Sequence, residues 1–367
     1  GLPQNPFRRR PRNSGTGGRQ VLFPCEIEIL IITQYILILL SRLYGIAVRT
    51  RKHLYRNGWL THRPLDRPTI CVGNITAGGT GKTPLCIYLM KTLRKKGFSP
   101  VLLLRGYRGK DGTCDEADIY RNRIPECPVG LGADRQQSLA RFPDADFAVM
   151  DDGLQHISLR PDVRIVVVDA LNPFDNHHLL PAGLLREPVS SIREYDIIVL
   201  SRTNLVDPGT LADLQAGLRD RFPEIPLFPC HQEIRTFLNV LSDAPAPDTD
   251  ALSQTAPIAV CGIGNPDSFQ CTLKQAGVDI SEMTVFPDHH DFKKKDIERI
   301  RRCADTYDTS VVLTTEKDMP KLRPLVRDTG LTFYYSKLDT GLEDEEKFWQ
   351  RVEELLEKRK DMHGEHR

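Results

Sequence analysis

The chain has 367 residues, of which 40% are hydrophobic and 27% charged, as is typical of a folded protein of about two domains. This mixture excludes collagen, a chain disordered throughout and a polytopic membrane protein. The formal net charge of +1 argues against a nucleic-acid partner. It conceals a split, because residues 1–68 carry 12 Lys and Arg against 3 Asp and Glu, whereas residues 69–367 carry 38 against 46. The sequence therefore predicts a basic arm joined to an acidic body.

The first 56 residues differ in character from the rest. Residues 1–20 contain several Gly and Pro but almost no apolar side chain, so we expect a disordered basic extension. Ten of the twelve residues from Ile29 to Leu40 are apolar, which predicts a helix of about 18 Å, short of a hydrocarbon core of about 30 Å. A longer span would include Arg42, and arginine clusters flank both sides. Residues 21–56 are thus expected to form a helix on an anionic membrane surface, with a single marginal crossing or an ordinary buried helix as alternatives.

The remainder of the chain has an α/β pattern. Short apolar runs alternate with helix-length segments, as in a parallel sheet with helices on both faces. The runs expected to be strands are PTICVGN, PVLLLRG, ADFAVMDDG, VRIVVVDA and YDIIVLSRT. We place the core at 57–240, a Pro- and Asp-rich linker at 241–257, and a smaller C-terminal α/β subdomain at 258–367.

The nine cysteines are scattered, odd in number and without a C-x-x-C pair. This pattern favours free thiols in a reducing compartment over disulfides or a zinc site. No internal repeat is visible, and nothing in the sequence indicates an obligate protein partner.

A glycine-rich turn, GNITAGGTGKT over residues 73–83, follows the first strand and precedes a helix. Its last residues match the pattern G-x-x-x-x-G-K-[ST], in which backbone N–H groups and the lysine hold phosphates and the hydroxyl contacts Mg²⁺. Thr76 occupies the first glycine position, and the neighbouring glycines supply the turn. The fold is therefore expected to be P-loop NTPase-like. The residues expected to bind ATP are Thr76, Ala77, Gly78, Gly79, Thr80, Gly81, Lys82 and Thr83.

Asp151 and Asp152 follow another apolar strand directly. Carboxylates at the C-terminal ends of parallel strands face the ligand crevice, and Mg²⁺ prefers hard oxygen ligands. We expect both aspartates beside the metal with Thr83, and a simple acidic turn is the alternative. The two motifs together predict nucleoside-triphosphate hydrolysis or phosphoryl transfer.

These motifs resemble those of the tetraacyldisaccharide 4′-kinases, the lipid A 4′-kinase family of Gram-negative bacteria. The resemblance covers roughly residues 40 to 335 in the family's order, and threonine at position 76 is a family feature. Beyond residues 72–84, the matching blocks are 105–107 (RGY), 151–156 (DDGLQH), 179–183 (LLPAG), 185–188 (LREP), 262–266 (GIGNP), 286–290 (FPDHH) and 315–318 (TEKD).

The resemblance implies that ATP phosphorylates the 4′-hydroxyl of an acylated glucosamine disaccharide 1-phosphate lipid, which gives the bis-phosphorylated lipid A precursor. It also implies a location at the cytoplasmic face of the bacterial inner membrane. Removing four acyl chains from a bilayer is costly at about 0.8 kcal/mol per CH₂, so the enzyme must approach its substrate there.

The resemblance further implies the roles of several residues. Asp115 is the expected base and His289 its partner, while Glu116 and His290 are neighbours that could take these roles instead. Cys114 replaces the family's usual glycine, which leaves a loop acid as the alternative for Asp115. The remaining expected site residues are Glu187, as an acid near the metal or in a loop salt bridge; Gln155 and His156, near the γ-phosphate or Asp151; and Arg105, at the substrate phosphate or as a basic strand end.

Two other functions fit part of the sequence. A membrane-recruited P-loop ATPase switch without a small-molecule acceptor would explain the arm, the phosphate loop and the acidic strand end. A soluble sugar or nucleoside kinase would not need the apolar arm.

Overall fold

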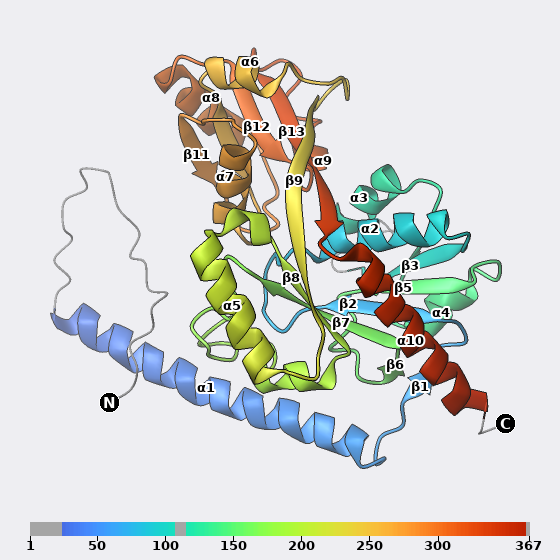
Figure 1. Ribbon diagram of the computed structural model, residues 1–367. Coiled ribbons are helices and arrows are strands. Elements are labelled where there is room, and N and C mark those ends of the chain that lie inside the picture. The colour runs from blue at the N-terminus through green and yellow to red at the C-terminus, as the bar shows by residue number, and fades with distance from the viewer. Residues whose placement is uncertain (1–23, 107–114, 365–367) are drawn as a thin grey trace.

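A computed structural model of the protein describes residues 24–106 and 115–364 (Figure 1). The expected disordered extension over residues 1–20 lies outside these ranges. One sheet of eleven strands runs through the described chain, in the order β11-β10-β12-β13-β9-β8-β7-β2-β5-β3-β4. All neighbours in it are parallel except β9 and β13.

Six strands form the half of the sheet that contains the phosphate loop. They are β2 (Thr69–Gly73), β3 (Pro100–Leu104), β4 (Val129–Leu131), β5 (Phe147–Asp151), β7 (Val163–Asp169) and β8 (Ile197–Ser201). Every residue of β2, β3, β5 and β8 is buried, which explains the continuous apolar runs of the sequence. Val72 of β2 pairs with both Asp151 and Ile165, so the loops after β2, β5 and β7 emerge at one edge.

Helices cover both faces of this half. One face carries α2 (Lys82–Lys95), α3 (Asp115–Arg123) and α10 (Glu345–Gly364), and the other carries α4 (Arg135–Ala140), α5 (Pro208–Arg221) and the 3₁₀ helix η1 (Val189–Glu194). The expected α/β fold with helices on both faces is confirmed. Helix α10, which the sequence placed in the C-terminal subdomain, instead packs on the core, where Phe348 and Trp349 are buried against the α2 side of the sheet (Figure 1).

Two long strands join this half to the rest of the sheet. β9 (Leu227–Asn239) begins beside β8, and it then pairs antiparallel with β13 (Thr332–Leu342), which continues beside β12 (Val311–Thr315) (Figure 1). The second half also contains β10 (Ile258–Cys261), β11 (Glu282–Val285), α6 (Thr249–Gln254), α7 (Pro266–Gln275), α8 (Lys294–Thr306) and α9 (Met319–Leu322). Residues 241–257, expected as a linker, contain α6. The two halves of the sheet are connected by β9 and β13. The placing of the domain boundaries remains a prediction.

Helix α1 (Pro24–Arg56) is 33 residues long and lies along the outside of the core (Figure 1). It is attached by Ser41, whose hydroxyl donates to the Leu179 carbonyl at 2.6 Å, and by Tyr44, whose hydroxyl donates to the Arg186 carbonyl at 3.0 Å. Ile32–Arg56 is long and apolar enough to cross a membrane by length and composition alone, and 11% of its apolar window is buried. Large apolar side chains stay exposed on it: Ile32, Tyr35, Ile36, Leu39, Leu40, Leu43 and Ile46.

The smallest elements lie at the edges of the fold. β1 (Arg63–Pro64) and β6 (Leu159–Arg160) form a short parallel pair after α1, and η2 (Thr203–Leu205) follows β8.

Candidate active site

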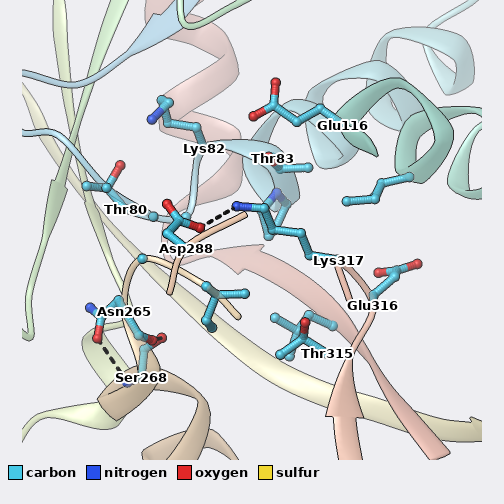
Figure 2. A pocket seen from close by; sticks show the side chains of 18 of the residues that line it. Thr80, Lys82, Thr83, Glu116, Asn265, Ser268, Asp288, Thr315, Glu316 and Lys317 are labelled. Carbon is cyan, nitrogen blue, oxygen red and sulfur yellow. Dashed lines mark hydrogen bonds and ion pairs between the residues drawn. The ribbon is translucent and has the colours of Figure 1, made fainter. Parts of the chain in front are cut away.

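A cavity of about 1150 Å³ lies between the phosphate loop and the second half of the sheet. The loop between β2 and α2 forms one wall, α3 and the end of β5 lie beside it, and the loops after β10, β11 and β12 form the opposite wall. Figure 2 shows Lys82 and Thr83 across the pocket from Asp288 and Lys317. The cavity therefore collects the expected nucleotide residues from Gly78 to Thr83 and one of the two expected histidines.

The phosphate loop ends at the N-terminus of α2. Gly81 precedes the helix with φ 87°, a left-handed conformation that favours glycine, and a Cβ at this position would lie 2.4 Å from Nε2 of Gln232. No side chain caps the helix, and its first turn contains no acidic residue. The free N–H groups and the positive end of the helix dipole are thus available to an anion.

Lys82 points along this loop into the cavity (Figure 2). Its Nζ donates to Oδ1 of Asn74 at 3.1 Å and lies 3.6 Å from Oδ1 of Asp152. These contacts hold the ammonium group where it can meet the β- and γ-phosphates.

The two aspartates at the end of β5 have different environments. Asp151 is 5% exposed, and burial raises its pKa to about 6 although Lys82 partly offsets the effect. The Tyr120 hydroxyl donates to its Oδ2 at 2.7 Å, while its buried Oδ1 has no hydrogen-bond partner among the residues that the structure describes. Burial alone would also raise the pKa of Asp152, but Lys82 and Arg186 outweigh it and lower that pKa. Nη1 of Arg186 contacts both Asp152 carboxylate oxygens at 2.9 Å.

The unpartnered oxygen of Asp151, together with the hydroxyl of Thr83, fits a magnesium ion held partly by the nucleotide. In the described parts of the chain, no group of three or more His, Cys, Asp or Glu is placed to hold a metal. Such an ion would therefore keep water and phosphate oxygens among its ligands, as Mg²⁺ commonly does.

Glu187, expected near the metal, lies outside the described lining of the cavity. It is 2% exposed and forms an ion pair with Lys52 of α1. The Tyr195 hydroxyl donates to it at 2.8 Å, and Nε2 of Gln155 does so at 3.0 Å. These contacts fit the salt-bridge alternative, and a role of Glu187 at the metal stays a prediction.

The expected acidic pair lies at the start of α3. Glu116 lines the cavity, whereas Asp115 begins the helix and its side chain lies outside the described residues (Figure 2). His289 lines the opposite wall with φ 60°, and its Nε2 lies 3.4 Å from Nζ of Lys317. The structure thus brings the acidic end of α3 and His289 to one cavity.

His290 is held away from this pair. Its ring stacks on Phe286 at 4.8 Å between centroids and meets Phe292 edge-on at 5.0 Å, and its Nε2 lies 3.0 Å from Oδ2 of Asp296. These contacts give His290 a packing role beneath the loop that presents His289.

The other expected residues divide between the cavity and its surroundings. Arg105 lines the cavity. Thr76 and Ala77 do not belong to the described lining: Thr76 is buried, and the N–H of Ala77 donates to the Leu184 carbonyl at 2.6 Å. Both residues therefore anchor the loop.

Gln155 and His156 also lie beside the cavity. Nε2 of Gln155 donates to the Asn74 carbonyl at 3.0 Å, which supports the base of the phosphate loop. His156 borders a separate cavity of about 510 Å³ beside Tyr55 and Arg63, and burial, followed by Arg135 and Arg105, lowers its pKa.

Several cavity residues had no role assigned from the sequence. They include Arg202, Gln232, Asn265 and Lys317. Asn265 and Lys317 lie inside sequence blocks already recognised as specific, which was the available signal, whereas Arg202 and Gln232 carry no local pattern. Only the order of strands in the sheet brings these last two to the phosphate loop.

A buried parallel sheet with a phosphate loop before a helix and an aspartate pair on the neighbouring strand defines a P-loop phosphotransferase or nucleotidase. The model of the tetraacyldisaccharide-1-P 4′-kinase family matches residues 33–357. The chain belongs to this family, and it is an enzyme of the kinase class.

Individual relatives carry the same family name. A tetraacyldisaccharide 4′-kinase of Halorhodospira halophila is 34% identical over 83% of this chain and 88% of the relative. A probable mitochondrial tetraacyldisaccharide 4′-kinase of Arabidopsis thaliana is 30% identical over 76% of this chain and 78% of the relative. A crystal structure of LpxK from Aquifex aeolicus in complex with ATP is 27% identical, with a TM-score of 0.66 over 88% of this chain and 99% of that one. The expected family and P-loop fold are confirmed.

Proposed function

We propose that the protein transfers the γ-phosphate of ATP to the 4′-hydroxyl of a tetraacylated glucosamine disaccharide 1-phosphate, giving the bis-phosphorylated lipid A precursor. The observation that carries the proposal is the cavity itself, in which a phosphate loop faces the acidic end of α3 and His289. A nucleotidase needs room only for an attacking water beside the phosphate loop, whereas transfer to an alcohol needs space for the acceptor and a base that accepts its proton. The names of the relatives support the choice of acceptor.

The reaction follows from the chemistry of these groups. The sugar oxygen forms a bond to the γ-phosphorus, the bond from that phosphorus to the β–γ bridging oxygen breaks, and ADP leaves. The hydroxyl proton passes to a carboxylate at the start of α3, which we assign to Asp115, and the His289 imidazole orients that carboxylate. Lys82 and the N–H groups of the loop stabilise charge on the transferring phosphoryl group.

Magnesium is part of this proposal. Thr83 and Asp151 would hold the ion, since the buried Oδ1 of Asp151 has no partner within residues 24–106 and 115–364. Bound there, Mg²⁺ would neutralise charge on the β- and γ-phosphates. Asp152, paired with Arg186, would act next to these ligands as a positioning acid.

The proposed location is the cytoplasmic face of the bacterial inner membrane. The apolar side chains of α1 are exposed up to Ile46, and basic residues follow them over the last turns of the helix. This combination suits an anionic bilayer surface, where an acylated phosphate-bearing substrate resides.

The test uses ATP labelled at the γ-phosphate and tetraacylated disaccharide 1-phosphate in mixed micelles. We expect label in the lipid product; label released only as inorganic phosphate would replace the proposal with the ATPase switch. Lys82→Ala should lower kcat by about 10²-fold or more, because it removes charge stabilisation of the transition state. Lys95→Ala, an exposed lysine on the same helix, is the matched control and should keep wild-type turnover.

A further inference from the structure

A chain of buried and partly buried polar contacts links the phosphate loop to α7 in the other half of the sheet. Asp169 is the last residue of β7, and Arg202 directly follows β8; they are 3% and 8% exposed. The guanidinium of Arg202 forms an ion pair with Asp169 through Nη1, and its Nη2 donates to the Gly79 carbonyl at 2.8 Å. Nδ2 of Asn265 donates to the same Asp169 oxygen at 3.1 Å. We call Asn265, Asp169 and Arg202 the relay.

The Asn265 side chain makes two hydrogen bonds, one as a donor and one as an acceptor. Its Oδ1 accepts from the Ser268 N–H at 3.1 Å and caps α7, a contact visible in Figure 2. Capping needs only an acceptor, and Ser or Asp would serve equally well. The Nδ2 contact to Asp169 is therefore an additional function that a cap alone does not require.

The residue before Asn265 lies directly against the phosphate loop. A Cβ on Gly264 would lie 3.2 Å from the Gly79 nitrogen and 3.0 Å from Oδ2 of Asp288. At this point the half that carries His289 lies directly against the loop that binds phosphate, and a side chain at Gly264 would crowd both Gly79 and Asp288. The relay lies next to this contact on both sides: Asn265 follows Gly264, and Arg202 donates to the Gly79 carbonyl.

We propose that Asn265, Asp169 and Arg202 are positioning residues that seat the His289-bearing half against the phosphate loop. The proposal rests on the proposed function, because it concerns binding and transfer of the nucleotide phosphate. Arg202 fixes the Gly79 carbonyl and so the shape of the loop, while Asn265 ties α7 to the same carboxylate. Nucleotide affinity and turnover then depend on the donor atom of Asn265 as well as on its cap.

The test separates the hydrogen bond that Asn265 donates to Asp169 from the capping of α7 by the same side chain. Asn265→Ser keeps a capping oxygen but removes the donor to Asp169, and Asn265→Asp keeps the cap but sets a second carboxylate beside Asp169. Asp248→Ser is the matched control, since Asp248 caps α6 at the Ala251 N–H away from the phosphate loop. Binding of a fluorescent ATP analogue without lipid, thermal unfolding, and KM and kcat for transfer are measured for each.

We expect Asn265→Ser to weaken binding of the analogue and lower kcat/KM by about 10-fold, the typical effect of one hydrogen bond to a charged group. Its thermal midpoint should stay close to that of Asp248→Ser, and Asn265→Asp should lose more affinity. Wild-type binding and kinetics in Asn265→Ser would overturn the proposal and leave Asn265 as a cap only. If Asn265→Asp does not fold, the binding and kinetics of Asn265→Ser alone decide whether the proposal holds. A wild-type protein that binds the analogue without labelling lipid would refute the proposed function alone, because the binding comparison still tests the relay.

Discussion

Neighbouring carboxylates in this protein have different roles because their surroundings differ. Asp151 keeps one buried oxygen without a partner in the described part of the chain, whereas the adjacent Asp152 is paired with Arg186 and Lys82. Glu187 is as deeply buried, but its oxygens are occupied by Lys52, Gln155 and Tyr195. An acid whose oxygens already accept from three donors stabilises the structure and is less available to a metal ion than one with an unpartnered oxygen.

Glu187→Gln distinguishes the two roles. It removes the buried one of the two charged partners of Lys52 and leaves Glu194 as the other. The free energy of unfolding should therefore fall by about 1–3 kcal/mol in urea titrations, while the Mg²⁺ concentration needed for half-maximal activity should not change. Glu353→Gln is the control for loss of an exposed ion pair, here with Lys96, and should cost less than about 1 kcal/mol. A large increase in the Mg²⁺ requirement of Glu187→Gln would restore Glu187 as a metal ligand.

At the scale of elements, the start of α8 supports the His289 loop. Asp296 accepts from the Lys293 N–H at 2.9 Å and lies 3.0 Å from Nε2 of His290. Burial alone would raise the pKa of Asp296, but the hydrogen bonds from His290 and from the Lys293 backbone, together with the charges of His290 and Lys295, outweigh it and lower that pKa. The stability gained from this carboxylate is therefore present above the unfolded pKa of about 3.9 and is lost as pH falls through the lower folded value.

Asp296→Asn tests this linkage. The variant should be less stable than wild type near neutral pH, and the gap should narrow below about pH 4, because the wild-type carboxylate becomes protonated there. Urea unfolding of both proteins at several pH values measures the gap. A gap that stays constant or widens toward acid pH would contradict the assignment of the lowered pKa.

Helix α1 presents its apolar side chains outward while polar contacts tie it to the core. Leu39 and Leu43 are 59% and 56% exposed, so charging them should leave the fold intact. The double variant Leu39→Glu/Leu43→Glu should no longer float with anionic phospholipid vesicles. It removes apolar area that would be buried in the bilayer and adds charge that anionic lipids repel. Leu241→Glu, at a 44% exposed leucine far along the chain, should float like wild type. Equal flotation of all three proteins would exclude this face as the membrane contact.

Across the whole molecule, local motifs were predictable from sequence and contacts between distant segments were not. The apolar strand before Gly73 and the glycines before Lys82 act through adjacent residues, so their pattern alone predicted the phosphate loop. Lys52 and Glu187 are 135 residues apart, and Arg202 and Gly79 are 123 apart. Such contacts arise from the strand order and from the docking of α1, neither of which leaves a periodic signal.

The basic arm and acidic body predicted from charge correspond to α1 with its flanking residues and to the sheet that carries the site carboxylates. That sheet is continuous through β9 and β13, and its two halves both line the cavity. A ligand bound there should therefore stabilise both halves together.

We expect ATP with Mg²⁺ at about 100 times Kd to add about 2.7 kcal/mol to the free energy of unfolding, in one cooperative transition. Hydrogen exchange should slow in β2 of the first half and in β10 of the second, since opening either half exposes the cavity. Lys82→Ala should reduce both effects, whereas the surface variant Lys95→Ala should retain them. Protection confined to β2 would show that the nucleotide is held by the phosphate loop alone, and the cavity wall formed by Asp288, His289 and Lys317 would then have no part in binding it.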